Sequence, residues 1–332
     1  MSKIYNNITE LIGKTPLVRL NRLEKALGLE AEIVVKLEFF NPNQNVKERI
    51  AYSMIKGAEE RGELKPGGKI IDLSSGNTGI SLAAVAAAKG YKLHVYMQDT
   101  ASPENKQILL AFGATYENLF THPRFAPLAA EYAGDAPKAM AQMLREESEK
   151  LGAYITNQLE NPDNPKAHYT TTGPEIWEDT DGKIDFFVSG AGTGGTLVGT
   201  GKYLREKKPD IKIVAYQAGP NSRPLESGNP EQPEMHGVHV IVGGPFIIPL
   251  LKGQENLWDE VIDVEAPTGW ETARVVAKHE GILIGESAGA AVHTAIQIAK
   301  RPENKGKRIV AMVPDSGSHY LTTGLFALPE IK

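Results

Sequence analysis

Short runs of β-branched and aliphatic residues alternate along this chain with longer, alanine-rich stretches, and glycine-rich turns separate the two. The runs have the length of strands, and the stretches that follow them have the length of helices. Strands that alternate with helices form βαβ units and mostly parallel sheets. The alternation therefore predicts an α/β fold, with strands at residues 32–37, 69–72, 92–97, 153–156, 186–189, 212–216, 281–284 and 308–313.

Two segments depart from this alternation. Residues 117–148 indicate a loop or cap followed by a helix, and the proline-rich residues 219–240 indicate an irregular surface loop. A length of 332 residues is that of two domains or one large α/β unit. Helices are expected at residues 46–61, 80–89, 103–112, 196–207, 270–280 and 288–300.

The composition excludes several classes of function. The formal net charge of −5 provides no basic surface for nucleic acid or for an anionic membrane. The absence of cysteine removes disulfides, zinc–thiolate sites and thiol nucleophiles, and no metal site is expected. The N-terminus lacks the pattern of a signal peptide, and the apolar stretch 80–88 is too short to span a bilayer. These features predict a cytosolic (cytoplasmic) enzyme.

The first glycine-rich turn, residues 74–79, joins a strand to a helix. Free backbone N–H groups at a helix start bind anions, and serine, asparagine and threonine side chains add donors. A substrate carboxylate fits such a turn. A helix cap with a tight turn explains the same residues equally well.

The second turn, residues 190–196, matches the dinucleotide fingerprint through Gly190, Gly192 and Gly195. That fingerprint requires an acidic residue after the next strand to bind a ribose. Gln217 stands there instead. The turn therefore favours a monophosphate over NAD.

The third turn, residues 285–289, matches the GxSxG elbow of serine hydrolases. Asp315 and His319 follow in the order of a hydrolase triad, but they are only four residues apart. Ser287 at a helix start is equally suited to bond a ring nitrogen. A fourth turn, residues 314–317, follows the last strand.

Lys47 lies at the start of an expected helix. A cation there is unfavourable, because the helix N-terminus is already positive. This location, together with burial, lowers the pKa of an amine and makes it nucleophilic. A lysine, a phosphate turn and a carboxylate turn together suggest pyridoxal phosphate. Taken alone, a lysine at such a position is more commonly a solvated surface residue.

In combination, these motifs resemble the cysteine synthase and cystathionine β-synthase family, most closely its O-acetylserine sulfhydrylases. The resemblance covers essentially the whole chain, and the motifs occur in the family's order. It implies the fold type II architecture of pyridoxal phosphate enzymes, with two domains. The matching segments are residues 12–17, 41–49, 75–79, 161–176, 192–196, 285–289 and 314–317.

The resemblance also implies pyridoxal 5′-phosphate as cofactor and assigns residues to it. Lys47 resembles the lysine that forms the imine with the cofactor aldehyde and moves the α-proton. Asn77 resembles the residue bonded to the 3′-oxygen, and Ser287 the residue bonded to the pyridine nitrogen. A neutral serine there leaves the ring unprotonated and favours β-elimination over transamination. The phosphate loop consists of Gly192, Thr193, Gly194, Gly195 and Thr196, and the substrate-carboxylate pocket of Ser74, Ser75, Gly76, Thr78 and Gln158.

The reaction implied is β-replacement on an O-activated L-serine such as O-acetylserine, through an aminoacrylate. A nucleophile, most often sulfide, then adds and gives L-cysteine. β-Elimination, cystathionine or lanthionine formation, and use of O-phosphoserine remain alternatives on the same scaffold. The resemblance further implies a smaller mobile domain (40–157) that carries the carboxylate loop and a larger domain (1–39 and 158–332) that carries the phosphate loop. A homodimer is expected, and a serine acetyltransferase is a possible partner.

Departures from the family pattern cluster around the substrate. They are Asn45 before the lysine, Leu73 before the carboxylate turn, Leu159 after the pocket glutamine, Gln217 in place of an acid, residues 240–245 in place of a Gly-Ile-Gly stretch, and an apparent insertion at 121–138. Arg223 either pairs with a phosphate or second carboxylate of the substrate or is a solvated surface residue.

Overall fold

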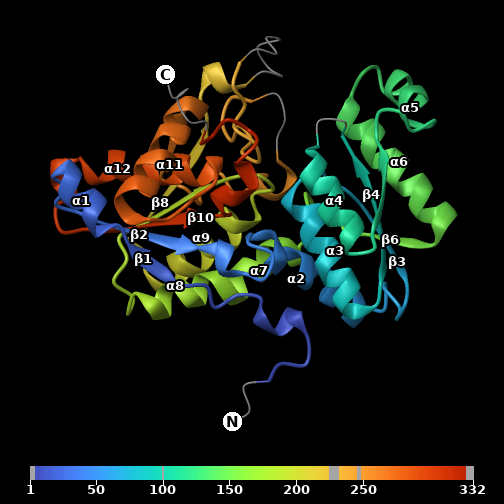
Figure 1. Cartoon of the computed structure of the whole chain (residues 1–332), viewed down its shortest axis with the longest axis horizontal. Helices are drawn as coiled ribbons and strands as arrows, with labels where there is room; N and C mark the ends of the chain where they lie inside the picture. Colours follow the sequence, from blue (N-terminus) through green and yellow to red (C-terminus); the bar gives the residue numbers. More distant parts are fainter. Residues whose placement is uncertain (1–3, 99–100, 224–231, 245–247, 327–332) are drawn as a thin grey trace, which may run out of the picture. The chain divides into compact units, whose positions relative to one another are not determined.

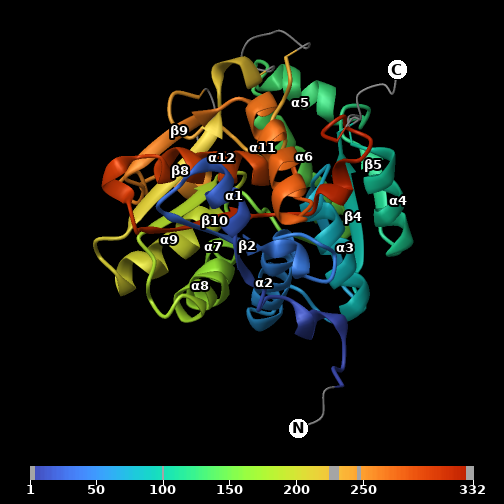
Figure 2. The same ribbon diagram turned by 60° about the vertical axis from the view of Figure 1, so that its left-hand side comes forward.

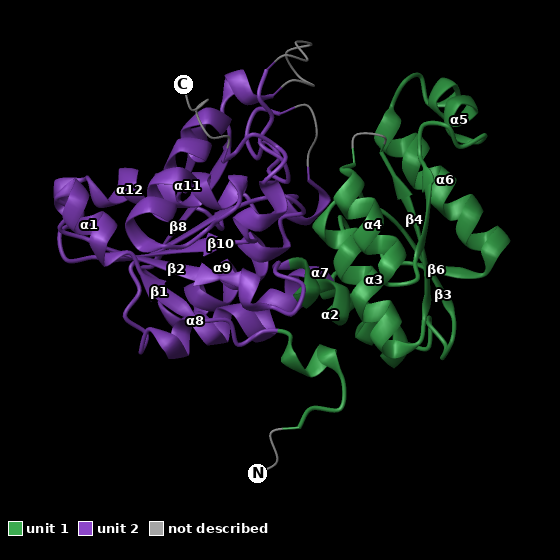
Figure 3. Cartoon of the chain, viewed as in Figure 1, with its two compact units in different colours: residues 1–12, 47–163 green, residues 13–46, 164–332 purple. Residues whose placement is uncertain are grey.

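The computed structural model describes residues 4–98, 101–223, 232–244 and 248–326. The chain forms two compact units, which Figure 3 distinguishes by colour. Unit 1 comprises Met1–Ile12 and Lys47–Asp163, and unit 2 comprises Gly13–Val46 and Asn164–Lys332. Each unit contains one sheet, and the α/β fold class with mostly parallel sheets is confirmed. The predicted 40–157 domain and its mobility stay predictions.

Unit 1 contains a parallel four-stranded sheet in the order β5-β4-β3-β6 (Figure 1). Ile71 and Tyr96 on one face of this sheet belong to a buried apolar cluster with Met143 and Leu144. Its strands are β3 (Lys69–Leu73), β4 (Lys92–Met97), β5 (Thr115–Asn118) and β6 (Ala153–Ile155), and its helices are α2 (Lys47–Glu60), α3 (Asn77–Lys89), α4 (Pro103–Ala111), α5 (Phe125–Glu131) and α6 (Ala136–Leu151).

Unit 2 contains a six-stranded sheet in the order β1-β2-β10-β7-β8-β9, in which only the edge pair β1–β2 is antiparallel. Its strands are β1 (Leu17–Arg19), β2 (Glu32–Leu37), β7 (Phe186–Gly190), β8 (Lys212–Ala218), β9 (Glu260–Val264) and β10 (Arg308–Val313). Its helices are α1 (Asn21–Leu27), α8 (Gly173–Asp179), α9 (Gly195–Lys207), α11 (Ala266–Glu280) and α12 (Glu286–Ala299). Helix α7 (Asp163–Ala167) begins at the last residue of unit 1 and continues into unit 2.

Alternate residues of the unit 2 strands face opposite layers of helices. Ile309 and Ala311 of β10 belong to the cluster that contains residues of α11 and α12, whereas Val310 belongs to the cluster that contains residues of α8 and α9. Figure 2 shows α8 and α9 on one side of this sheet and α11 on the other. Both faces are therefore buried, which explains the nearly continuous apolar runs of these strands.

Two glycines allow α11 and α12 to pack closely. A β-carbon at Gly289 would lie 2.1 Å from the carbonyl oxygen of Gly269. Close helix packing therefore explains Gly289, the second glycine of the GxSxG sequence, without a hydrolase elbow.

The structure corrects several sequence-based boundaries. The strand expected at 281–284 is wrong. Helix α11 ends at Glu280, the next residue, Gly281, has a positive φ of 68°, and only Ile284 forms a β-bridge, to Ser316, before α12 begins. The strands β1, β5 and β9 were not expected. Residues 117–148 contain two helices, α5 and α6, in place of one. Of the predicted loop 219–240, residues 224–231 lie outside the described part of the chain.

Candidate active site

The turn between β3 and α3 brings together the residues predicted for the substrate carboxylate. The Ser74 hydroxyl accepts hydrogen bonds from the amides of Gly79 (2.9 Å) and Gly76 (3.4 Å). The Ser75 hydroxyl accepts one from the amide of Gln98 at 2.9 Å. The serines therefore shape the turn at the start of a 13-residue helix, where backbone amides and the helix dipole favour an anion.

Gln158, 80 residues further along the chain than Thr78, reaches the same turn. The Thr78 hydroxyl donates to its Oε1 at 2.7 Å. This bond fixes the side-chain amide of Gln158 against the first turn of α3. Unit 1 by itself thus unites Ser74, Ser75, Gly76, Asn77, Thr78 and Gln158.

Lys47 is the first residue of α2 and is half-buried. The two residues before it belong to unit 2 and are anchored there. The Val46 amide donates to the Pro314 carbonyl at 2.8 Å, and Asn45 forms a β-bridge with Asp315. The fourth predicted turn therefore holds the segment that leads into the lysine. Asn45 is fully buried, and its side-chain amide donates to the Asn43 carbonyl at 2.9 Å. This hydrogen bond gives the departing residue a structural role.

The glycine loop of unit 2 follows β7 and opens α9. Gly194 has a φ of 87°, a conformation that favours glycine. A β-carbon at Gly195 would lie 1.8 Å from the Asn164 side-chain oxygen. Among the described residues, the amides of Gly192, Thr193 and Gly194 have no hydrogen-bond acceptor. Three free amides at a helix start form an anion site that matches a phosphate.

Two residues that sequence reasoning gave no role hold the threonines of this loop. The Asn164 amide donates to the Thr193 hydroxyl at 2.9 Å, and His168 Nε2 lies 3.2 Å from the Thr196 hydroxyl. His168 is buried, and its Nδ1 lies 2.9 Å from the Thr172 hydroxyl. Both residues lie in the segment 161–176. The resemblance of this segment to the family was the one sequence feature that could have indicated their role.

Ser287 is the second residue of α12 and is buried. The Tyr216 hydroxyl donates to its carbonyl at 2.8 Å, and burial raises the pKa of Tyr216, which keeps it a donor. Within the described part of the chain, the Ser287 hydroxyl has no hydrogen-bond partner. A buried hydroxyl in this state suits a ligand nitrogen or oxygen.

The residue before it, Glu286, is buried and lies against a histidine. His236 Nδ1 is 2.9 Å from Glu286 Oε2, and this hydrogen bond raises the pKa of His236. The pair ties the segment around His236 to the start of α12.

The serine hydrolase alternative finds no support in the geometry. The Asp315 carboxylate accepts a hydrogen bond from the Tyr320 hydroxyl at 2.6 Å. In the described residues, no hydrogen bond joins the His319 side chain to Ser287 or to Asp315. The GxSxG match is therefore a helix start without a triad.

Gln217, which stands where a dinucleotide-binding protein has an acid for the ribose, forms hydrogen bonds within the protein. Its Oε1 accepts from the amides of Ile241 (2.8 Å) and Val242 (2.9 Å), and its Nε2 donates to Asp263 Oδ1 (2.8 Å) and to the Val242 carbonyl (3.3 Å). Gln217 therefore holds residues 241 and 242 of the departing segment 240–245, of which Pro245 lies outside the described residues.

The structure also gives roles to Arg223 and to the departing residue Leu73. Arg223 is mostly buried, and it donates to the Ala218 carbonyl at 2.7 Å and to Asp263 at 3.3 Å, so the solvated interpretation is wrong. Leu73 packs against the apolar cluster of unit 1. That contact explains Leu73 by packing.

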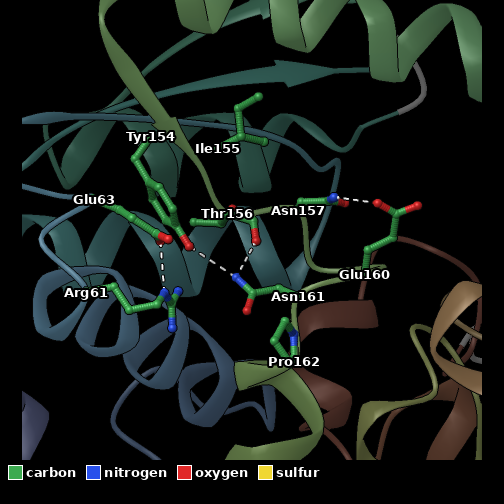
Figure 4. A pocket seen from close by; sticks show the side chains of 9 residues that line it. All are labelled: Arg61, Glu63, Tyr154, Ile155, Thr156, Asn157, Glu160, Asn161 and Pro162. Carbon is green, nitrogen blue, oxygen red and sulfur yellow. Dashed lines mark hydrogen bonds and ion pairs between the residues drawn. The ribbon is translucent and has the colours of Figure 1, made fainter.

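A cavity of about 390 Å³ lies in unit 1 beside the segment that carries Gln158. Figure 4 shows the side chains around it. None of the predicted site residues lines it. Its lining consists of Arg61, Glu63, Tyr154, Ile155, Thr156, Asn157, Glu160, Asn161 and Pro162.

The described residues contain neither a cluster of metal ligands nor a membrane-spanning helix. No cluster of three or more histidine, aspartate or glutamate side chains there has the arrangement of a metal site. None of the helices in that part of the chain has both the length and the apolar character needed to span a bilayer.

Comparison with known proteins agrees with this geometry. Residues 8–315 match the family described as pyridoxal-phosphate dependent enzyme. A cysteine synthase of Staphylococcus aureus (strain Mu50 / ATCC 700699) is 41% identical over 329 residues, which cover 99% of each chain. A crystal structure of cysteine synthase from Entamoeba histolytica superposes with a TM-score of 0.84 at 38% identity, covering 100% of this chain and 93% of the other. A structure of O-ureido-L-serine synthase gives 0.84 at 36% identity, with 99% and 98% coverage.

Proposed function

The chain belongs to the family of pyridoxal-phosphate dependent enzymes, and we propose that it replaces the β-substituent of O-acetyl-L-serine with sulfide to form L-cysteine. It is a β-substituting enzyme, and its cofactor is pyridoxal 5′-phosphate. The observation that carries the substrate assignment is the turn 74–78, in which the Thr78 hydroxyl holds Gln158 against a helix start.

The residues of the chain fit this cofactor. The three free amides of the glycine loop, with the hydroxyls of Thr193 and Thr196, would bind its phosphate. The buried hydroxyl of Ser287, which lacks a partner among the described residues, would bond the pyridine nitrogen. Asn77 would bond the 3′-oxygen, and Lys47 the aldehyde. When bound, the cofactor supplies an electron sink that acidifies the α-proton and lets the β-substituent leave.

Lys47 would act as the base. Its amine takes the α-proton of the amino acid and returns it to the product, so the same side chain serves both halves of the reaction. A position at the start of α2 favours the neutral amine that this role requires.

The carboxylate turn would orient the substrate. Amides at the start of α3, the hydroxyls of Ser74 and Ser75, and the side-chain amide of Gln158 provide donors for one carboxylate. The Thr78 hydroxyl contributes by holding Gln158, to which it donates its proton. Since a neutral amino acid carries its carboxylate and amine on the same carbon, holding the carboxylate fixes the α-proton relative to the base.

Ser287 would set the reaction type. A serine hydroxyl carries no charge, so it does not hold a proton on the pyridine nitrogen as a carboxylate would. A weaker electron sink favours loss and replacement of the β-substituent over transamination.

A spectroscopic titration tests this function. The protein with bound cofactor should show a visible absorbance band that shifts on addition of O-acetyl-L-serine and returns on addition of sulfide. A band that ignores O-acetyl-L-serine would contradict the substrate, and a protein that binds no pyridoxal phosphate would contradict the entire assignment.

Partners and location extend this proposal. A homodimer and a cytosolic location are supported by the resemblance to cysteine synthases. A serine acetyltransferase is the proposed protein partner, and a pull-down with that enzyme tests it.

A further inference from the structure

A buried carboxylate that the proposed chemistry does not use lies at the end of β3. Asp72 is 2% exposed. Its Oδ1 accepts from the Leu73 amide at 2.6 Å, and its Oδ2 accepts from the Thr156 hydroxyl. No cation contacts it among the described residues. Because burying a carboxylate without a counter-ion costs free energy, these hydrogen bonds carry its stabilisation.

The partner hydroxyl belongs to the segment that carries Gln158. Thr156 follows β6 directly, is fully buried, and lies two residues before Gln158. Its carbonyl accepts from the Asn161 amide at 2.8 Å, as Figure 4 shows. The Asn161 backbone amide donates to the Asn157 carbonyl at 2.9 Å. The turn 157–161 is therefore closed onto Thr156 and has little freedom of its own.

The two ends of the carboxylate turn are bonded to this same segment. Asp72 precedes the turn and contacts Thr156, and Thr78 ends it and contacts Gln158. The hydrogen-bond donors of residues 73–77 thus lie between two anchored residues, Asp72 and Thr78. The partners of these two residues, Thr156 and Gln158, are only two positions apart in the sequence. Loss of the bond between Asp72 and Thr156 frees the first end of the turn, and loss of the bond between Thr78 and Gln158 frees its last end and the side-chain amide of Gln158.

We propose that Asp72 and Thr156 are positioning residues that set the substrate-carboxylate turn and Gln158 in their working geometry. The inference rests on the proposed function in one respect, namely that this turn binds the substrate carboxylate. Neither residue touches the substrate. Their contribution is to hold donors where the carboxylate binds, so their loss weakens binding of the amino acid more than the chemical step.

Thr156→Val removes the hydroxyl and keeps the shape, whereas Thr156→Ser keeps the hydroxyl. In the holoenzyme with O-acetyl-L-serine and sulfide, we expect Thr156→Val to raise KM for O-acetyl-L-serine about tenfold with kcat within about twofold, since a hydrogen bond to a charged group is lost. Thr156→Ser should remain within about twofold on both constants. Thr180→Val is the matched control, because Thr180 is a buried threonine of unit 2 whose hydroxyl donates to the Ile176 carbonyl at 2.7 Å.

Hydrogen–deuterium exchange of the unliganded protein gives a readout that needs no turnover. The amides of Gly76 and Gly79 donate to Ser74, so they report on the turn. We expect faster exchange of the peptide that contains them in Thr156→Val, and unchanged exchange in Thr156→Ser and Thr180→Val. Unchanged exchange together with an unchanged KM in Thr156→Val overturns the proposal, and so does an equal effect of Thr156→Ser. If the wild-type holoenzyme does not use O-acetyl-L-serine, the proposed function fails, and the exchange result still decides the positioning role.

Discussion

At the scale of single residues, the sequence pointed to most of the candidate site because its chemistry depends on residue types that stand in short motifs. Lys47, Asn77, Ser287 and the glycine loop all occur at helix starts, and the structure places each of them there. Asn164 and His168 received no role from the sequence. Their contacts with Thr193 and Thr196 span 28 or 29 positions, and no local pattern encodes such a pair.

Replacing Lys47 with alanine tests the residue on which the chemistry depends most. We expect Lys47→Ala to lower kcat by about 10³-fold or more, because it removes both the covalent attachment and the base. The visible band of the cofactor-bound protein should also be lost or displaced. Lys56→Ala, a change of an exposed lysine on the same helix, should leave both unchanged. A normal band in Lys47→Ala with an intact far-UV circular dichroism spectrum would refute the assignment.

Asp72 predicts a particular pH dependence of stability. Burial raises the pKa of Asp72 to about 6 from its ordinary 3.8, against the opposing effect of its hydrogen bonds to Thr156 and Leu73. Between these two pH values the folded protein retains a proton that the unfolded chain has lost, so the stabilisation is present at low pH and is lost as pH rises toward 6. The cost above that pH is roughly 3 kcal/mol.

Asp72→Asn removes this titration. From urea unfolding of both proteins at several pH values between 4 and 7, the stability of the variant relative to wild type should rise by up to about 3 kcal/mol across that range. Parallel curves for the two proteins would show that Asp72 does not titrate there.

At the scale of elements, the alternating pattern predicted most strands and helices, and the misses have physical causes. Helices α3, α11 and α12 begin two to four residues earlier than expected, since polar and glycine residues of their first turns resemble the preceding loop. The strands β1, β5 and β9 escaped notice because they have three to five residues and lie at sheet edges, where burial is partial. Residues 281–284 are as apolar as a strand, but only one of them pairs.

The segment 237–242 lies outside the helices and strands, and its attachment can be tested. The His239 amide donates to the Ala191 carbonyl at 2.8 Å, and Gln217 bonds the amides of Ile241 and Val242. Gln217→Glu replaces the donor that faces Asp263, at 2.8 Å, with an oxygen. We expect a loss of about 1–2 kcal/mol in stability at neutral pH, limited by the exposure of Asp263.

A second substitution provides the control. Asp263→Asn in the Gln217→Glu background restores a donor facing an acceptor, so the double variant should recover most of the lost stability in thermal unfolding. If the double variant is as unstable as Gln217→Glu alone, this hydrogen bond does not hold the segment.

At the scale of the whole molecule, the resemblance implied two domains and a homodimer. The two compact units are present, but their boundaries fall at 46/47 and 163/164, and residues 1–12 belong with unit 1. The membership of residues 1–12 in unit 1 depends on contacts between distant segments, which composition does not reveal. The quaternary state depends on surfaces that carry no motif.

Exposed apolar side chains near the N-terminus allow the expected dimer to be tested. Ile4 is 88% exposed and Ile8 is 45% exposed, and Tyr5 and Leu11 beside them are also exposed. Clustered exposed apolar groups mark association surfaces. We expect light scattering to give twice the monomer mass of 36.0 kDa for the wild type and a lower mass for Ile4→Ser combined with Ile8→Ser. Leu27→Ser, at another exposed apolar position, should remain dimeric. A wild type that is monomeric would contradict the expected dimer.

The central claim is that the cofactor-bound chain replaces the β-substituent of O-acetyl-L-serine. The most direct measurement is product analysis by mass spectrometry after incubation of the holoenzyme with O-acetyl-L-serine and sulfide, beside the Lys47→Ala variant. The account predicts one L-cysteine and one acetate for each O-acetyl-L-serine consumed, and no cysteine from the variant. Pyruvate and ammonia in place of cysteine, or no consumption of O-acetyl-L-serine, would contradict it.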